Sequence, residues 1–392
     1  MLVPLLVAAA VAVEPAALVP ARAQAALLAT DLGVAAGHVT ELLRSAGHRL
    51  PYLSPSSQGR EQRRLLGVDL LDESDRFDAG VDSGGAAAAF ALADGTVVAS
   101  LPIRDAARAR ERWSGWALAT GGVAQRPKRS GGVTLIAVKH GTRVDAAYAL
   151  ASGRLLVCPS SRDPLAALAV ALAAGKKPLA KDAAFKAAFA AVPASPLRAW
   201  LRGEPKSALA AVGAALFPAT GGLRVDGRAV AAARALLADA PAPAWSAPSG
   251  SFAIVRASLG PGGVGALREL FRRANLDAGL VPDAPRFAAA ATGIDYRARR
   301  LEQVVRSVVA PSDALSTGAG ADALVADFSA AEVLAALRPL TPLMALEGEV
   351  PAALIGVKLT ASPLLRALGP ARLTARADGK DGRFHLDAPI AP

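Results

Sequence analysis

The stretch SFAIVRASLGPGGVGALRELFRR, residues 251–273, places an apolar run, a glycine-rich turn and a helical pattern in succession. Gly260, Gly262 and Gly265 follow the order G-x-G-x-x-G, which is typical of a loop that holds the pyrophosphate of a dinucleotide. A dinucleotide-binding fold continues through the helix into a second parallel strand that ends in an acidic residue. Here residues 275–287 follow, with two prolines and no strand-like run. We therefore interpret the glycines as a strand-to-helix turn and predict no cofactor.

The same strand-turn-helix order recurs along the chain. Residues 25–47 carry an apolar run, a turn and a helical pattern, but Ala35 and His38 stand at or near the places of the second and third glycines. Residues 321–340 repeat the order, and residues 196–217 form a looser copy. We therefore expect four related units. Because the turn keeps its place between strand and helix where the glycines are lost, we interpret it as structural.

The remaining patterns predict antiparallel hairpins and short helices. Short β-like runs meet at Asp94-Gly95, at Gly141, at Ser152-Gly153 and within residues 371–390. Helical patterns cover residues 105–119, 163–174, 182–192 and 295–309, and the first three begin with an aspartate that can cap the helix. This mixture predicts an α+β fold of mainly antiparallel sheets, with Ala-rich helices packed on them and repeated strand-turn-helix units.

The two ends of the chain and a proline-rich stretch suggest the domain organisation. Residues 2–13 are apolar but shorter than the 20 or so residues that span a membrane. They fit the core of a signal peptide, and residues 10–12 offer a small-x-small cleavage site. We expect a signal peptide and leader over residues 1–24, an N-terminal α+β domain over 25–240 and a related C-terminal domain over 250–392, with the boundary in the proline-rich residues 238–250. The mature protein is then periplasmic or extracellular, with no transmembrane segment.

Composition limits the partners. The net charge is +11, yet the arginines are scattered and aromatic residues make up only 4% of the chain. A nucleic-acid-binding protein more often gathers its basic residues and interleaves aromatic ones. We therefore expect no nucleic acid as partner. The candidate partners of this basic surface are an anionic envelope polymer, a lipid headgroup and another envelope protein.

Few residues suit catalysis or metal binding. The single cysteine, Cys158, lies in an apolar run and is expected to be a buried strand residue, so no internal disulfide forms. The four histidines, His38, His48, His140 and His385, occupy turns or hairpins without an H-x-x-x-H pair, and we interpret them as structural. The order of the acidic residues 67–82 differs from that of a calcium loop. We therefore interpret them as helix caps and a solvated face. We predict no catalytic residue, no cofactor-binding residue and no metal ligand.

A family resemblance rests on larger segments. The segments GVDLLD (67–72), DAGVDSGGAAAAFALADGTVVASLPIRDAARARERW (78–113), YALASGRLLVCPSSRDPLAAL (148–168) and LAKDAAFKAAFAAVP (179–193) together resemble the uncharacterised exported bacterial proteins grouped as a domain of unknown function. TGIDYRARRL (292–301) is similar to the turn that opens the first of them. The resemblance implies export and repeated α+β units, and it carries over no catalytic residue and no ligand.

Three interpretations of function follow. The first is a non-enzymatic exported protein with a binding or scaffolding role in the cell envelope. The alternative is a carrier that holds an apolar or acyl ligand between sheet and helices. The third is an unusual hydrolase.

Overall fold

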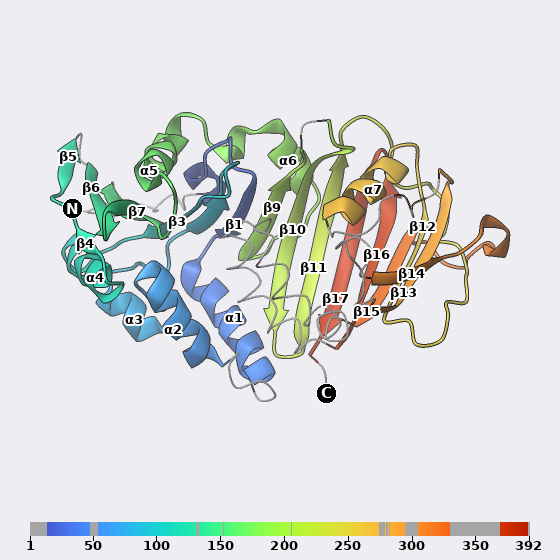
Figure 1. Cartoon of the computed structure of the whole chain (residues 1–392), viewed down its shortest axis with the longest axis horizontal. Helices are drawn as coiled ribbons and strands as arrows, with labels where there is room; N and C mark the ends of the chain where they lie inside the picture. Colours follow the sequence, from blue (N-terminus) through green and yellow to red (C-terminus); the bar gives the residue numbers. More distant parts are fainter. Residues whose placement is uncertain are drawn as a thin grey trace, which may run out of the picture.

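The chain forms one large antiparallel sheet with helices packed on it (Figure 1), which confirms the expected α+β class. The computed structural model describes residues 14–47, 54–130, 133–151, 153–204, 206–273, 279, 281, 283–294, 305–329 and 369–390. The strands follow one another across the sheet in the order β5 (Lys128–Ser130) and β4 (Val123–Ala124), which both pair with β6 (Val133–His140), then β7 (Arg143–Ala151), β8 (Arg154–Cys158), β3 (Val97–Pro102), β2 (Ala87–Ala91), β1 (Ala25–Ala29), β9 (Leu197–Arg202), β10 (Leu209–Ala219), β11 (Gly222–Ala231), β17 (Asp381–Pro389), β16 (Pro370–Asp378), β15 (Leu324–Ser329), β12 (Ala253–Ser258), β13 (Arg286–Ile294) and β14 (Val305–Val309).

The helices lie mainly on the N-terminal half of this sheet. They are α1 (Leu32–Gly47), α2 (Pro55–Leu66), α3 (Glu73–Asp78), α4 (Ala106–Ala119), α5 (Pro164–Leu172), α6 (Ala183–Phe189) and α7 (Gly263–Arg273), with the short 3-10 turns η1 (Pro15–Leu18), η3 (Ala173–Lys176), η4 (Leu179–Lys181) and η7 (Ser312–Ala314). The helices expected over residues 105–119, 163–174 and 182–192 are confirmed as α4, α5 and α6. In each, the predicted aspartate accepts hydrogen bonds from amides of the first turn.

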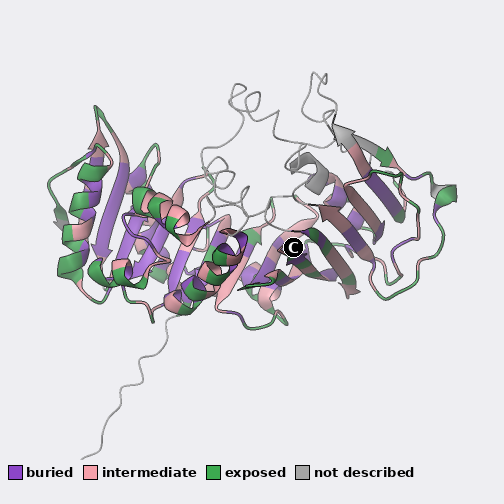
Figure 2. Cartoon of the chain, turned by 90° about the horizontal axis from the view of Figure 1, so that it is seen from below, coloured by how far each residue is buried: buried purple, intermediate pink, exposed green. Residues whose placement is uncertain are grey.

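Both faces of the sheet are buried in the N-terminal half. On β7, Tyr148 packs with Trp116 of α4 on one face, whereas Ala149 packs with Leu168 of α5 on the other. Figure 2 shows these strands buried between helices with exposed outer faces. A strand covered on both faces has no polar side, which explains why the runs that form β7 and β8 are apolar without alternation.

The two faces of the sheet differ in the C-terminal half. Ala257 of β12 packs with Leu267 of α7 and with Phe287 of β13, while the preceding residue, Arg256, points to the opposite face. Successive strand residues alternate between faces, so the register carries this division from β12 to β11. From β16 to β11 the opposite face is polar, whereas on β15 and β13 it also carries the apolar residues Val325 and Ala288, the second packed with Ala310 and Leu315.

Two of the four expected strand-turn-helix units are confirmed, as β1 with α1 and as β12 with α7. The unit over residues 196–217 was wrong, because its second half is the strand β10, which pairs with both β9 and β11. Small residues are needed there so that α6 can lie against the strand: a Cβ on Gly213 would lie 2.6 Å from the Ala188 carbonyl oxygen. In the unit over residues 321–340, β15 is present and residues 330–340 lie outside the described residues.

Other predictions have mixed outcomes. The hairpins at Gly95, Gly141 and Gly153 and over residues 371–390 are confirmed. The helix expected over residues 295–309 was wrong for its last part, because Val305–Val309 pair with β13 as β14, and residues 295–304 lie outside the described residues. The β-branched valines of this segment favour a strand.

The structure bears only indirectly on the domains. Strand β11 precedes the proline-rich residues 238–250 and pairs with β17, which follows them, so strands from both sides of the expected boundary lie side by side. The division into two domains stays a prediction, and so does the signal peptide, whose residues 1–13 lie outside the described part of the chain. None of the helices in the described residues has the length and apolar character that crossing a membrane requires.

Candidate functional site

The glycine-rich turn between β12 and α7 is a close contact between two segments of backbone. The amide of Gly260 donates to the Leu236 carbonyl at 3.0 Å, and the amide of Gly262 donates to the Ala235 carbonyl at 2.7 Å. The strand after α7, β13, is antiparallel to β12, whereas a dinucleotide fold has a parallel strand there. The amides that would face a pyrophosphate thus bind the chain itself.

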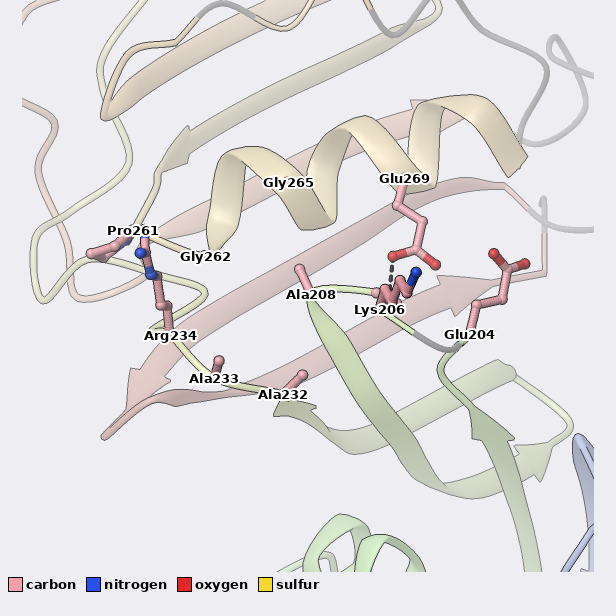
Figure 3. A pocket seen from close by; sticks show the side chains of 11 residues that line it. Glu204, Lys206, Ala208, Ala232, Ala233, Arg234, Pro261, Gly262, Gly265 and Glu269 are labelled. Carbon is pink, nitrogen blue, oxygen red and sulfur yellow. Dashed lines mark hydrogen bonds between the residues drawn. The ribbon is translucent and has the colours of Figure 1, made fainter.

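A cavity of about 550 Å³ lies beside this turn (Figure 3). Figure 3 shows Glu204, Lys206 and Glu269 at one end and Arg234 at the other. Glu269 of α7 is buried and accepts a hydrogen bond from the Ser207 hydroxyl. The cavity therefore has a charged lining that includes a hydrogen-bonded serine and glutamate.

The larger polar feature is the face of the C-terminal strands opposite α7. We define the polar face by the side chains that share it in register: Arg224, Asp226 and Arg228 of β11, Arg383, His385 and Asp387 of β17, Arg372, Thr374 and Arg376 of β16, Asp327 of β15 and Arg256 of β12. Side chains directly opposite on neighbouring strands lie about 5 Å apart at their Cβ atoms. The polar face is therefore a grid of side chains that interact across strands.

One row of this grid consists of arginines. Arg228, Arg383 and Arg376 stand directly opposite one another on β11, β17 and β16. Two carboxylates from the β16–β17 turn partly neutralise them: Asp381 accepts from Arg228 at 2.7 Å, and Asp378 accepts from Arg383 at 2.9 Å. The hydrogen bond from Arg383 holds the pKa of Asp378 below its usual value, since it favours the charged carboxylate.

The next two rows alternate in charge. Asp226, His385 and Thr374 form the second row, and the His385 Nδ1 lies 2.6 Å from an Asp226 oxygen. Arg224, Asp387 and Arg372 form the third row. The rows thus present acidic and basic groups in alternation.

Arginines reach furthest from the sheet on this face. The side chain of Arg224 is 53% exposed and that of its partner Asp226 is 22% exposed. Arg372 is 61% exposed against 40% for its partner Asp327. Arg228 lies deeper, close to the sheet. The outer layer of the polar face is consequently rich in guanidinium groups.

A second cavity, of about 330 Å³, opens on the polar face. Its charged and polar lining consists of Asp226, Asp322, Thr374, Arg376, Arg383 and His385, and residues 191–193 line it from the chain that follows α6. Ala191 lies two residues beyond the end of α6 and adopts the left-handed region, with φ of 77°. An alanine in this conformation costs about 1–2 kcal/mol, so the surrounding structure holds this wall of the cavity in place.

The predicted structural histidines lie at separate places. His140 contacts Asp145 at 2.6 Å through Nδ1 and Thr120 at 3.3 Å through Nε2, near one end of the sheet. His385 lies on the polar face, His38 lies half-buried on α1, and His48 is outside the described residues. Sequence reasoning missed both aspartate partners. Asp145 follows His140 across the turn at Gly141 and could have been found from the hairpin, but nothing in the sequence joins Asp226 to His385.

The buried strand position of Cys158 is confirmed. The side chain is fully buried at the end of β8, packed against α5. Burial raises the pKa of the thiol to about 12, because the thiolate is poorly solvated there. The thiol therefore lacks the features of a reactive cysteine.

The acidic residues 67–82 form ion pairs and a helix cap. Asp72 caps α3, and Asp75 binds both Arg63 at 3.1 Å and Arg112 at 2.7 Å. The prediction of a solvated face was wrong for Asp69, because this residue is buried beneath α2. The contact is so close that a Cβ on Gly59 of α2 would overlap the Asp69 carboxylate. Among the described residues, no three His, Cys, Asp or Glu side chains gather as metal ligands.

Comparisons with known proteins add little to this geometry. No family model matches the chain, and no curated protein matches it. The chain is similar to a solved structure described as "Structure of crystal form I of TP0453", with a TM-score of 0.30 and 10% sequence identity, over 56% of this chain and 79% of that one. A likeness at this level assigns neither a fold family nor a function.

Proposed function

We propose that this chain is an exported, non-enzymatic protein of the cell envelope and that its polar face binds an anionic envelope polymer. The observation that carries the proposal is the set of guanidinium groups on the neighbouring strands β11, β17 and β16, including the exposed Arg224 and Arg372. In the N-terminal half both faces of the sheet are buried, whereas here charged side chains remain exposed.

The charges on this face suit a repeating partner better than a small ligand. Arg224 and Arg372 lie in one row on β11 and β16, with Asp387 of β17 between them. Arg376 extends the same surface along β16. A polymer with regularly spaced anionic groups can engage several guanidinium groups at once, and the net charge of +11 increases the rate of encounter.

Binding to soluble probe polymers tests the proposal. Purified protein is titrated with fluorescent polyphosphate and dextran sulfate, and the variant R224E/R372E is compared with the charge-matched control R44E/R143E, whose arginines are exposed on α1 and β7. We expect the first variant to lose at least tenfold in affinity and the control less than threefold, with binding that weakens as salt rises. Equal losses in the two variants would assign the attraction to net charge alone and refute a binding face.

A second measurement separates this function from the carrier alternative. An organic extract of natively purified protein is analysed by mass spectrometry. A stoichiometric acyl ligand would favour the carrier, whereas an extract without one, together with loss of polymer binding in R224E/R372E, supports the polar face as the binding surface.

A further inference from the structure

We propose that Arg376, Arg383, His385 and Thr374 form a subsite for a phosphate group on the polar face. The inference rests on the proposed function and names the chemical group that the face selects. The four side chains come from two neighbouring strands, and all line the cavity of about 330 Å³, which Asp226 and Asp322 also line.

The arrangement of the donors favours a tetrahedral anion. Arg376 is directly opposite Arg383, and Thr374 is directly opposite His385. Positions two apart on a strand are separated by about 7 Å and opposite positions by about 5 Å, so the four residues stand at the corners of a rectangle on one face of the sheet. A phosphate has oxygens that can meet donors on all sides, whereas a carboxylate has two oxygens in one plane.

The two arginines leave a charge without a close partner. Like charges directly opposite each other on a sheet are destabilising. Arg383 is held by Asp378, but Arg376 has no carboxylate within ion-pair distance among the described residues, and Asp378 affects it only electrostatically. An anion bound between the two guanidinium groups would remove this repulsion, which is the physical gain that binding supplies.

The histidine has one ring nitrogen available. Its Nδ1 is engaged by Asp226, which fixes the ring, and Nε2 has no hydrogen-bond partner within the described part of the chain. Nε2 can accept from a protonated phosphate oxygen when the ring is neutral and donate to the anion when the ring is protonated. Thr374 adds a hydroxyl that donates to a phosphate oxygen.

The test uses inorganic phosphate as the probe. Phosphate binding at low ionic strength is measured by calorimetry for the full chain, for R376A and for the control R143A, whose arginine is exposed on β7, outside the polar face. We expect R376A to weaken phosphate binding at least tenfold and R143A less than twofold, since a charge-assisted bidentate contact contributes about one to two factors of ten. R376K, which keeps the charge but loses the fork, is expected to recover only part of the affinity.

Several results would overturn the subsite. These are the absence of phosphate binding by the wild type, equal losses in R376A and R143A, or acetate binding as tightly as phosphate. Vesicles of phosphatidylcholine with and without phosphatidic acid identify the source of the group: binding that requires phosphatidic acid assigns the subsite to a lipid headgroup and overturns an assignment to free or polymer phosphate.

Failure of the subsite and failure of the proposed function give different results. If R224E/R372E loses polymer binding while phosphate binding is absent, the result supports the polar face as a binding surface and refutes the phosphate subsite. If phosphate binds through Arg376 but neither polymer binds, the result supports the subsite and refutes the proposed function. Thermal unfolding of each variant shows whether it is folded. We expect R376A to fold, because Arg376 is exposed and donates no hydrogen bond in the described structure.

Discussion

Replacement of Gly262 by alanine tests whether the glycine-rich turn is a contact between backbones. The φ of Gly262 is outside the left-handed region, so alanine is allowed there by the local conformation. The obstacle is another segment of chain: a Cβ on Gly262 would lie 2.7 Å from the Arg234 carbonyl oxygen and 3.2 Å from that of Ala235. Backbone atoms cannot rotate away as a side chain can, and the Ala235 oxygen accepts the Gly262 amide.

The structure determines the sign of the effect. Alanine restricts the unfolded chain and so stabilises by about 0.4–1 kcal/mol, whereas forcing extra atoms into a packed site costs about 1–3 kcal/mol. We therefore expect Gly262→Ala to lower the free energy of unfolding by about 1–2 kcal/mol. Gly265 is the matched control, because its Cβ would meet only the Ala208 Cβ at 3.7 Å, an ordinary contact. Gly265→Ala lies in a helix and should stabilise by up to about 1 kcal/mol.

Urea unfolding and thermal unfolding of the two variants measure these differences. The thermal experiments are repeated with NAD, NADP, FAD and ATP at millimolar concentration, since a ligand at 100 times its Kd stabilises by about 2.7 kcal/mol. Equal stability of the two variants would refute the close approach to residues 234–235. A nucleotide-dependent rise in Tm for the wild type that disappears in Gly262→Ala would restore the loop as a cofactor site.

Three further predictions concern other parts of the chain. Native protein should react with a thiol reagent far more slowly than denatured protein, and Cys158→Ala should cost about 1–2 kcal/mol; fast native labelling would contradict the burial of this thiol. Partial burial raises the pKa of Asp182, but hydrogen bonds from Arg202 and from helix amides lower it more, so the net shift is downward. The stabilisation by Asp182 is then present above the unfolded pKa and lost as pH falls through the folded one, so Asp182→Asn should flatten the acid branch of the stability curve below about pH 4; an unchanged acid branch would contradict this. N-terminal sequencing of exported protein should place the mature start close to Val13, because Val19 is buried in the core; a start beyond Val19, or an intact Met1 in a soluble cytoplasmic fraction, would contradict it.

The sequence alone was sufficient where local chemistry decides the structure. Asp105 and Asp163 cap the helices they precede, since an aspartate before a helical run can accept from amides that have no other partner. Gly95 and Gly153 adopt the positive φ that their turns require. The apolar run that ends at Cys158 indicated a buried strand, because its consecutive residues are all apolar, without the alternation of a strand that has one exposed face.

Tertiary structure decided whatever depends on distant partners. Residues 209–219 have a composition suited to a helix, but pairing on both sides with β9 and β11 makes them a strand. The polar face depends on the register of strands far apart in the chain: Asp226 meets His385, 159 residues later, only because β11 pairs with β17. A sequence shows which residues alternate along one strand, but the free energy that selects the neighbouring strand comes from contacts summed over the whole sheet. The candidate site lies on such pairings, and for that reason the sequence by itself did not reveal it.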